Sequence, residues 1–341
     1  MDFSHFIVED HFKQYDICPG EPKPLPTYLQ IELTNRCNLH CPSCPRAVRP
    51  SSDDILSLRD FERLLEELPL LKHVSFVGAG ETLLVKNFAE YVRICSKRRI
   101  LSSCTTNGLL IKKCLAELIE AGLGKIMISV DAGKEVLLAT LRSGLRLTTL
   151  RQAILAAIEM THGTQTSVSA AVTLSAMNIA SFVNTICFLV DCGIREVTVE
   201  SLHHWGNDKS LNKFSLFYIN PQQVVESIEE GLVVALKHDL QVHIFDYRRV
   251  LFRDHLQSCH CPWPWDAIYV TCKGDVTPCC VNVEATSSNR MGNIHKTSVS
   301  EIWNGRRYHN LRKSFFNKHQ WSTCIDCVYR MEFGQIMEIN K

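Results

Sequence analysis

Three cysteines, Cys37, Cys41 and Cys44, lie in the stretch NRCNLHCPSCP, directly after a run typical of a strand, YLQIELT. A 4Fe-4S cluster has four iron corners, and four thiolates close it, so three thiolates leave one iron open to another ligand. The spacing C-x3-C-x2-C therefore predicts a cluster whose fourth iron binds a substrate or a cofactor. A zinc site and a packing coincidence are the alternatives, although zinc sites more often pair two C-x2-C motifs and take four ligands.

The composition bounds the class of protein. The chain has 341 residues, of which 45% are apolar and 21% charged, and a formal net charge of +1 gives no field that attracts nucleic acid. The first ten residues lack a basic region before an apolar core, and no apolar run is long enough for a membrane span. We therefore expect a cytoplasmic protein with no nucleic-acid or membrane partner. Sixteen cysteines in that compartment favour metal or redox chemistry over disulfides.

The elements that must position the three cysteines follow from the pattern of residues 29 to about 246, where short β-rich runs alternate with amphipathic stretches. The expected strands are residues 29–33, 73–77, 100–104, 125–129, 167–173 and 196–200. Six strand-helix units require a parallel sheet with right-handed crossovers. Six is fewer than the eight of a closed barrel, so we predict an α/β fold, a partial (β/α)6 TIM-like barrel, with its active site at the C-terminal ends of the strands.

The pattern changes after residue 250, where cysteine, tryptophan, proline and glycine become frequent. A loop-rich segment with few apolar residues usually needs a metal to hold it. We expect three parts: an N-terminal extension (1–27), the barrel (28–254) and a C-terminal domain (255–341).

These motifs together resemble the radical S-adenosylmethionine (SAM) superfamily. The segments GAGET (78–82), TTNG (105–108), SVDAG (129–133) and LRSG, which contains Arg142, match its SAM-binding segments. The resemblance implies that the open iron chelates SAM, and that reduction cleaves SAM to methionine and a 5′-deoxyadenosyl radical. It also implies a set of SAM-binding residues: Gly78, Ala79, Gly80, Glu81, Asn107, Ser129, Asp131 and Arg142. Ser43 departs from the bulky residue that usually precedes the third cysteine, and GAG replaces the commoner Gly-Gly pair.

The C-terminal cysteines resemble the auxiliary-cluster extension of SPASM and twitch radical SAM enzymes. Cys261 is followed by twelve residues, Gly274, four residues and Cys279, and a C-x2-C pair, Cys324 and Cys327, comes later. No cysteine follows Cys327, which favours the twitch form with one auxiliary 4Fe-4S cluster on these four thiolates. Such a closed cluster would relay or accept electrons, or anchor the segment. Structural zinc is the alternative on the same ligands. Three cysteines of this segment remain without an assigned role: Cys259, Cys272 and Cys280. They could serve a second auxiliary cluster, or Cys280 could donate a hydrogen atom to a substrate radical, as in radical epimerases.

Alternation along the strands predicts a polar barrel interior. If Leu29 and Ile31 face the helices, then Gln30 and Glu32 face inward, and the same period places hydroxyls and carboxylates at the ends of later strands. Such a cavity suits a hydroxyl- or amine-bearing substrate. Glu200, with His203 and His204 just beyond it, is the candidate for substrate contact or proton transfer, although a salt-bridged rim carboxylate is an equal alternative.

The expected function is therefore hydrogen abstraction from a small polar molecule, such as an aminocyclitol, sugar or sugar nucleoside, in antibiotic or other natural-product biosynthesis. The outcome would be dehydrogenation, decarboxylation or epimerisation by an oxidoreductase or lyase-type enzyme, with a flavodoxin or ferredoxin as electron donor. A peptide-modifying maturase is the alternative. Such maturases often carry an N-terminal peptide-recognition domain, whereas here only residues 1–28 precede the first strand, which favours the small molecule. A non-catalytic iron-sulfur protein is a third hypothesis, but it would give the open iron no function.

Overall fold

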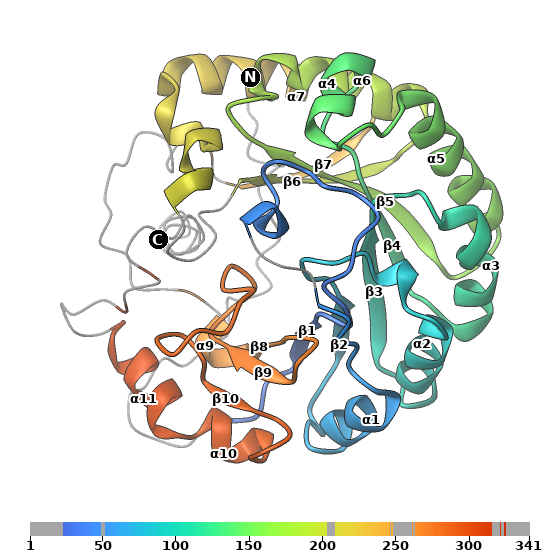
Figure 1. The fold of residues 1–341 in the computed structure, drawn as a ribbon. Helices are drawn as coiled ribbons and strands as arrows, with labels where there is room; N and C mark the ends of the chain where they lie inside the picture. Colours follow the sequence, from blue (N-terminus) through green and yellow to red (C-terminus); the bar gives the residue numbers. More distant parts are fainter. Residues whose placement is uncertain are drawn as a thin grey trace.

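A computed structural model of the protein describes residues 23–48, 52–202, 209–245, 247, 261, 263–315, 321 and 324. Its centre is a ten-stranded sheet in the order β10-β9-β8-β1-β2-β3-β4-β5-β6-β7, curved so that helices cover its outer side (Figure 1). Strands β1 to β7 run parallel, β8 pairs parallel with β1, and β9 and β10 are antiparallel. The strands are β1 Tyr28–Ile31, β2 His73–Phe76, β3 Leu101–Thr106, β4 Lys125–Ser129, β5 Ser167–Leu174, β6 Glu196–Ser201, β7 Gln241–Ile244, β8 Ala267–Val270, β9 Asp275–Thr277 and β10 Gly292–Asn293.

The helices follow the strands in the order expected of a parallel sheet. They are α1 Leu58–Glu66, α2 Phe88–Lys97, α3 Ile111–Ala121, α4 Glu135–Leu141, α5 Leu147–Thr161, α6 Phe182–Asp191, α7 Pro221–Lys237, α9 Trp263–Asp266, α10 Val299–Trp303 and α11 Arg306–Lys313. A short 3-10 helix, η2 (Pro45–Val48), follows the three cysteines. No helix in the described ranges has the length and apolar content to cross a membrane.

All six predicted strands are present; the strand 125–129 has the predicted ends, and no end of the others is shifted by more than two residues. The barrel is longer than predicted, because β7 extends the parallel sheet beyond β6. That strand was missed because it has only four residues, QVHI, and two of them are polar. At the other edge, β8 pairs with β1, so the sheet continues past the boundary expected near residue 255. The division of the chain into three parts stays a prediction.

The core lies between the sheet and the helices. Leu29 and Ile31 of β1 and Phe76 of β2 are fully buried, and Phe61 of α1 packs on Phe76 with 5.7 Å between ring centroids. The alternate positions face the inside of the barrel, as the period of two in a strand requires. Apolar side chains thus pack between the strands and the outer helices, and the polar positions of the strands face the barrel interior.

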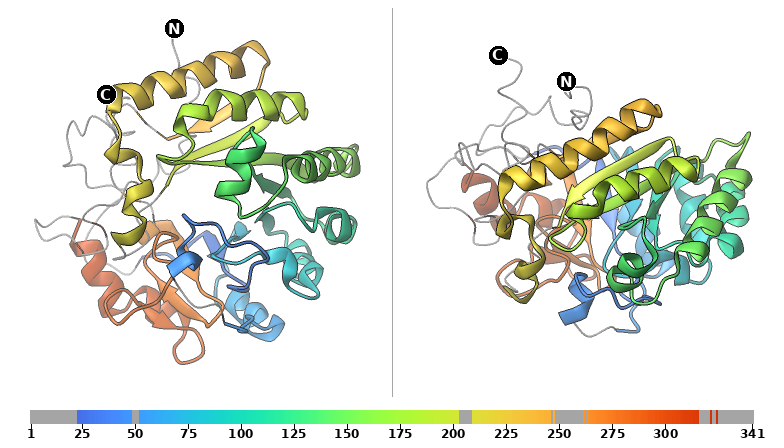
Figure 2. Two further views of the ribbon diagram at one scale, coloured as in Figure 1. Left: turned by 45° about the horizontal axis from the view of Figure 1, so that its top comes forward. Right: turned by 90° about the horizontal axis from the view of Figure 1, so that it is seen from above.

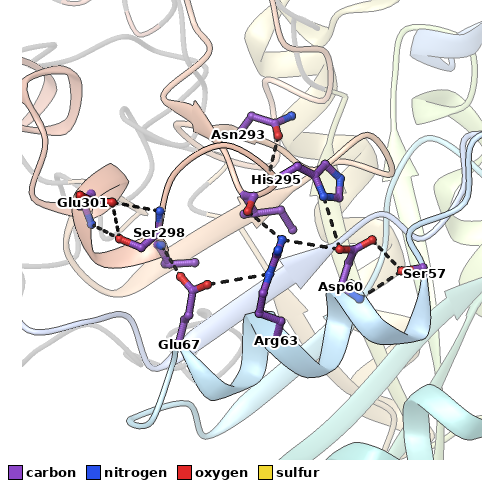
Figure 3. A network of polar contacts seen from close by, with 10 residues as sticks. Ser57, Asp60, Arg63, Glu67, Asn293, His295, Ser298 and Glu301 are labelled. Atoms are coloured by element: carbon purple, nitrogen blue, oxygen red, sulfur yellow. Dashed lines mark hydrogen bonds and ion pairs between the residues drawn. The ribbon is translucent and has the colours of Figure 1, made fainter.

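Helix α1 joins the barrel to the segment around β10 and α10 (Figure 3). Arg63 Nη2 donates to the Ile294 carbonyl (2.8 Å), Glu67 accepts from the Val299 backbone N–H, and Asp60 lies 3.4 Å from His295 Nδ1. Strands β8 to β10 form one edge of the sheet and β7 forms the other, and the left view of Figure 2 shows the orange and red segment away from the gold helix α7. Charged groups on one helix therefore fix the C-terminal segment beside β1.

Candidate active site

A cavity of about 220 Å³ lies at the C-terminal ends of the barrel strands, where the loop with the three cysteines crosses the mouth (Figure 1). Each of the three cysteines and each of the eight expected SAM-binding residues lines it. These residues are Cys37, Cys41, Cys44, Gly78, Ala79, Gly80, Glu81, Asn107, Ser129, Asp131 and Arg142. They come from loops after β1, β2, β3 and β4 and from the end of α4. Folding therefore brings together groups that lie as much as 105 residues apart in the chain.

The loop after β2 packs directly on the cysteine loop. A Cβ atom at Gly80 would overlap the carbonyl oxygen of Thr34 and lie 2.7 Å from that of Arg36, and the Glu81 N–H donates to the Arg36 carbonyl (2.7 Å). A Cβ atom at Gly78 would overlap the Glu32 side chain. Glycine is needed here because only a residue without Cβ allows two backbones to approach this closely.

Glu81 ties the loop after β2 to the loop after β3. It is 3% exposed, and its carboxylate accepts hydrogen bonds from the Asn107 N–H, the Thr106 hydroxyl (both 2.8 Å) and the Leu83 N–H (3.1 Å). Burial raises its pKa, although these donors oppose the shift. Glu81 therefore acts on the cavity by holding Asn107 in place.

Asn107 in turn reaches the cysteine loop. Its Nδ2 donates to Asn38 Oδ1 (2.7 Å) and lies 3.8 Å from Cys37 Sγ. A side-chain amide near a thiolate sulfur stabilises the negative charge that a cluster ligand must carry. The TTNG segment thus has a structural role beside the first cysteine.

Arg142 and Asp131 form a buried ion pair on the other wall. Arg142 Nη2 lies 2.6 Å from Asp131 Oδ2, and the side chains are 16% and 12% exposed. Asp131 Oδ1 also accepts from the Thr173 N–H (2.9 Å). Arg142 Nε is buried and has no hydrogen-bond partner among the described residues. The pair leaves Arg142 Nε available, and a hydrogen bond from a guanidinium suits the carboxylate of SAM.

The thiols fit the ligand set of a cluster. Burial raises the pKa of Cys41 and raises that of Cys44 to about 11, and the charge of Arg142 lowers both. Cys37 and Cys41 raise the pKa of Cys44, so the three sulfurs lie within electrostatic range of one another. A cluster supplies the positive iron that such thiolates need, and Arg142 offsets part of their charge. Among the described residues, no three His, Cys, Asp or Glu side chains form a site for a single metal ion.

The expected ligands of the auxiliary cluster are only partly described. Cys261 and Cys279 pack against the same apolar group, which includes Tyr269, and Asn282 Nδ2 lies 3.2 Å from Cys279 Sγ. Cys324 is half-buried. Cys327 and the alternative ligand Cys259 lie outside the described residues. Cys272 is buried against Glu32, whose Oε1 lies 3.5 Å from the Cys272 backbone N.

Glu200 and Cys280, the two candidate catalytic residues, are not among the described residues that line the cavity, but the charges of both act on Tyr28. The pKa of Tyr28 is raised first by burial and then by the charges of Cys280 and Glu200, while a hydrogen bond with Ser75 opposes the shift. Tyr28 alternates with Gln30 along β1 and so faces the same side of the sheet, but it does not line the cavity. His203 and His204 lie outside the described residues.

Comparison with known proteins decides the family. A model of the radical SAM superfamily matches residues 31–189, and a model of the SPASM iron-sulfur cluster-binding domain matches residues 259–328. The chain belongs to the radical SAM superfamily. This radical SAM enzyme carries a SPASM domain, and its cofactors are accordingly 4Fe-4S clusters and SAM.

Similar proteins extend the likeness over most of the chain. The tungsten-containing aldehyde ferredoxin oxidoreductase cofactor-modifying protein of Pyrococcus furiosus is 23% identical over 336 residues, which cover 89% of this chain and 87% of that protein. The structure of SuiB from Streptococcus suis bound to SAM has a TM-score of 0.69 at 17% identity, over 90% of this chain and 72% of SuiB. Native anSMEcpe with bound SAM has a TM-score of 0.65 at 18% identity, over 85% and 84%. These structures confirm the partial barrel with a C-terminal SPASM domain.

Proposed function

We propose that this radical SAM enzyme abstracts a hydrogen atom from a small polar substrate, an aminocyclitol, sugar or sugar nucleoside, in natural-product biosynthesis. One observation carries the proposal: the three cysteines, the loop of Gly78 to Glu81 and the pair Asp131–Arg142 line one cavity above a polar barrel interior. When bound there, the reduced 4Fe-4S cluster supplies the electron that cleaves SAM.

The residues of the chain would divide the remaining work. Cys37, Cys41 and Cys44 would hold the cluster, and the loop of Gly78 to Glu81 would present backbone groups to the SAM amino group. Arg142 would bind the SAM carboxylate through the Nε that lacks a partner in the described structure. Asp131 would hold Arg142 in place, and Ser129 and Asn107 would complete the wall.

Two observations support the small-molecule class. Thr173 lines the cavity on the barrel side, beside the wall that Ser129 and Asp131 form for SAM, so it offers a hydroxyl group to a polar substrate. The relative that matches most of this chain is named for modifying a cofactor of another enzyme. Dehydrogenation, decarboxylation and epimerisation are all open to the substrate radical, and Glu200 and Cys280 are the candidates for proton transfer and for hydrogen return.

The test is SAM cleavage by protein reconstituted without oxygen and reduced by dithionite or by a flavodoxin or ferredoxin. We expect wild type to form 5′-deoxyadenosine, and the triple variant Cys37→Ala, Cys41→Ala, Cys44→Ala to form none. Cys187→Ala, which removes an exposed cysteine, is the matched control and should cleave SAM normally. A fully loaded wild type that leaves SAM intact would refute the proposed function.

The substrate class is then tested by hydrogen transfer. Transfer of deuterium into 5′-deoxyadenosine is measured with deuterated aminocyclitols, with deuterated nucleosides and with deuterated peptides. Transfer from a peptide and from none of the small molecules would favour the maturase alternative.

A further inference from the structure

A second cavity of about 180 Å³ lies beside the SAM cavity, at the C-terminal ends of β1 and β8. The two cavities adjoin, because Arg46, Ala79 and Val283 line both. The other residues that line the second cavity include Glu32, Asn35, Cys272, Lys273, Asp275 and Arg290. It therefore extends the active site toward the turn between β8 and β9.

Several charged groups of the second cavity already have protein partners. Asp275 Oδ1 lies 3.0 Å from Arg290 Nε, and Lys273 pairs with Asp54 at 3.6 Å. Glu32 Oε2 accepts from the Ala79 N–H (2.8 Å), which fixes this carboxylate behind the loop after β2. These groups contribute to the shape of the cavity more than to its capacity for a new ion pair.

Arg46 differs from the other two cations. It lies in η2, two residues after Cys44, and its Nη1 donates to the Leu39 carbonyl (3.0 Å). Among the described residues, its Nε is buried without a hydrogen-bond partner, and no carboxylate pairs with its guanidinium. A guanidinium has five N–H donors, so most of its capacity is unused. Leaving a partly buried charge without a counter-ion is costly, which favours a site that is completed by a ligand.

Arg46 follows the cluster loop in the chain and lines both cavities, so its guanidinium lies at their junction.

We propose that Arg46 binds an anionic group of the substrate, a carboxylate or a phosphate, at the junction of the SAM cavity and the second cavity. This inference rests on the proposed function, because the group belongs to the molecule that the radical attacks. It narrows the substrate to an anion, such as a sugar acid or a sugar phosphate, whose remaining atoms extend into the second cavity. The planar fork of arginine suits both oxyanions.

The test uses the reconstituted protein with SAM bound and two probes, inorganic phosphate and acetate. Binding is measured by broadening of the phosphate ³¹P and acetate ¹³C resonances as protein is added. We expect Arg46→Gln to weaken binding at least about tenfold, since hydrogen bonds to charged groups contribute about 1.5–3 kcal/mol. Arg290→Gln removes a cation of the same cavity that is already paired, and it should change binding less than about threefold. Arg46→Lys keeps the charge without the fork, so it should retain phosphate better than acetate.

Each outcome decides the question. The role of Arg46 is overturned if neither anion binds wild type at millimolar concentrations. It is also overturned if wild type and Arg46→Gln bind the anions equally. Loss of SAM affinity without loss of anion binding would make Arg46 a SAM ligand instead. Iron content and absorption spectra show whether Arg46→Gln is folded and loaded, and if it is not, the comparison of Arg46→Lys with Arg290→Gln decides. Failure of wild type to cleave SAM would count against the proposed function and not against anion binding.

Discussion

Glu196 shows how a single carboxylate is stabilised inside the barrel. Its Oε1 lies 2.6 Å from Lys125 Nζ and 3.2 Å from His243 Nε2, across strands β4, β6 and β7. The hydrogen bond with His243 and the bond and charge of Lys125 lower the pKa of Glu196 to about 2, and burial opposes the shift. The charged form of Glu196 is therefore favoured in the folded state.

Glu196→Gln should lower the free energy of unfolding by about 2–3 kcal/mol at pH 7, because it leaves Lys125 without its carboxylate. The folded pKa is below the ordinary value of 4.5, so this contribution is complete above pH 4.5 and is lost as the pH falls toward 2. Urea unfolding of both proteins, with clusters removed, measures the difference at pH 7 and pH 3. Glu90→Gln, in the exposed pair with Arg93, is the control and should change little. A difference that stays constant with pH would contradict the role of the charge.

At the scale of elements, α1 has two tasks. Its first turn is fixed by Ser57, which accepts from the Asp60 N–H (3.1 Å), and its buried face packs on the sheet through Phe61 and Leu65. Arg63 on its exposed face donates to the Ile294 carbonyl, which precedes α10. Glu67, directly after the helix, accepts from the Val299 N–H at the start of α10 (Figure 3). The helix therefore fixes the C-terminal segment as well as covering β2.

Glu67→Ala removes the acceptor of the Val299 N–H. A hydrogen bond to a charged group contributes about 1.5–3 kcal/mol, so amide exchange in residues 292–303 should become about ten to a hundred times faster. Hydrogen exchange followed by mass spectrometry measures this change, while β3 and β4 should exchange as in wild type. The neighbouring Glu66, which pairs with Arg98 at the surface, supplies the control Glu66→Ala. Unchanged exchange in residues 292–303 would mean that α10 is held by its apolar contacts.

At the scale of the whole molecule, one sheet connects the two groups of cysteines. Strand β8 lies beside β1, and the Thr27 hydroxyl bonds to Asp266 (2.8 Å) at the start of both strands. At the other end of β1, Tyr269 and Cys272 approach Glu32. The two groups of cysteines are therefore attached to one connected framework.

Cys279→Ala should reduce the iron content of the reconstituted protein from about eight to about four atoms per chain, because each 4Fe-4S cluster is lost as a unit. Iron and sulfide analysis measures the change, and formation of substrate-derived product should cease. The Cys187→Ala protein should keep its full iron content. Bound zinc, or iron that stays constant in Cys279→Ala, would show that the C-terminal cysteines do not hold an auxiliary cluster.

The sequence by itself determined the order of the elements, and it predicts the cluster ligands. The spacing of Cys37, Cys41 and Cys44 is a local property, since one loop after one strand presents all three thiols. The six predicted strands were also found from local alternation, because apolar residues at every second position have only the helices to pack against. The segments around Gly80, Asn107 and Asp131 could be assigned because each follows a strand directly.

Only the tertiary structure decided which groups meet. The polar strand β7 is stabilised by its pairing with β6, so its residues carry little strand signal of their own. The junction at Arg46 joins Ala79 and Val283, which come from loops far apart in the chain. Among the described residues Arg46 Nε has no partner, which depends on what the packing leaves nearby and follows from no local pattern. Local spacing fixes ligands within a loop, whereas contacts between loops depend on how the sheet closes.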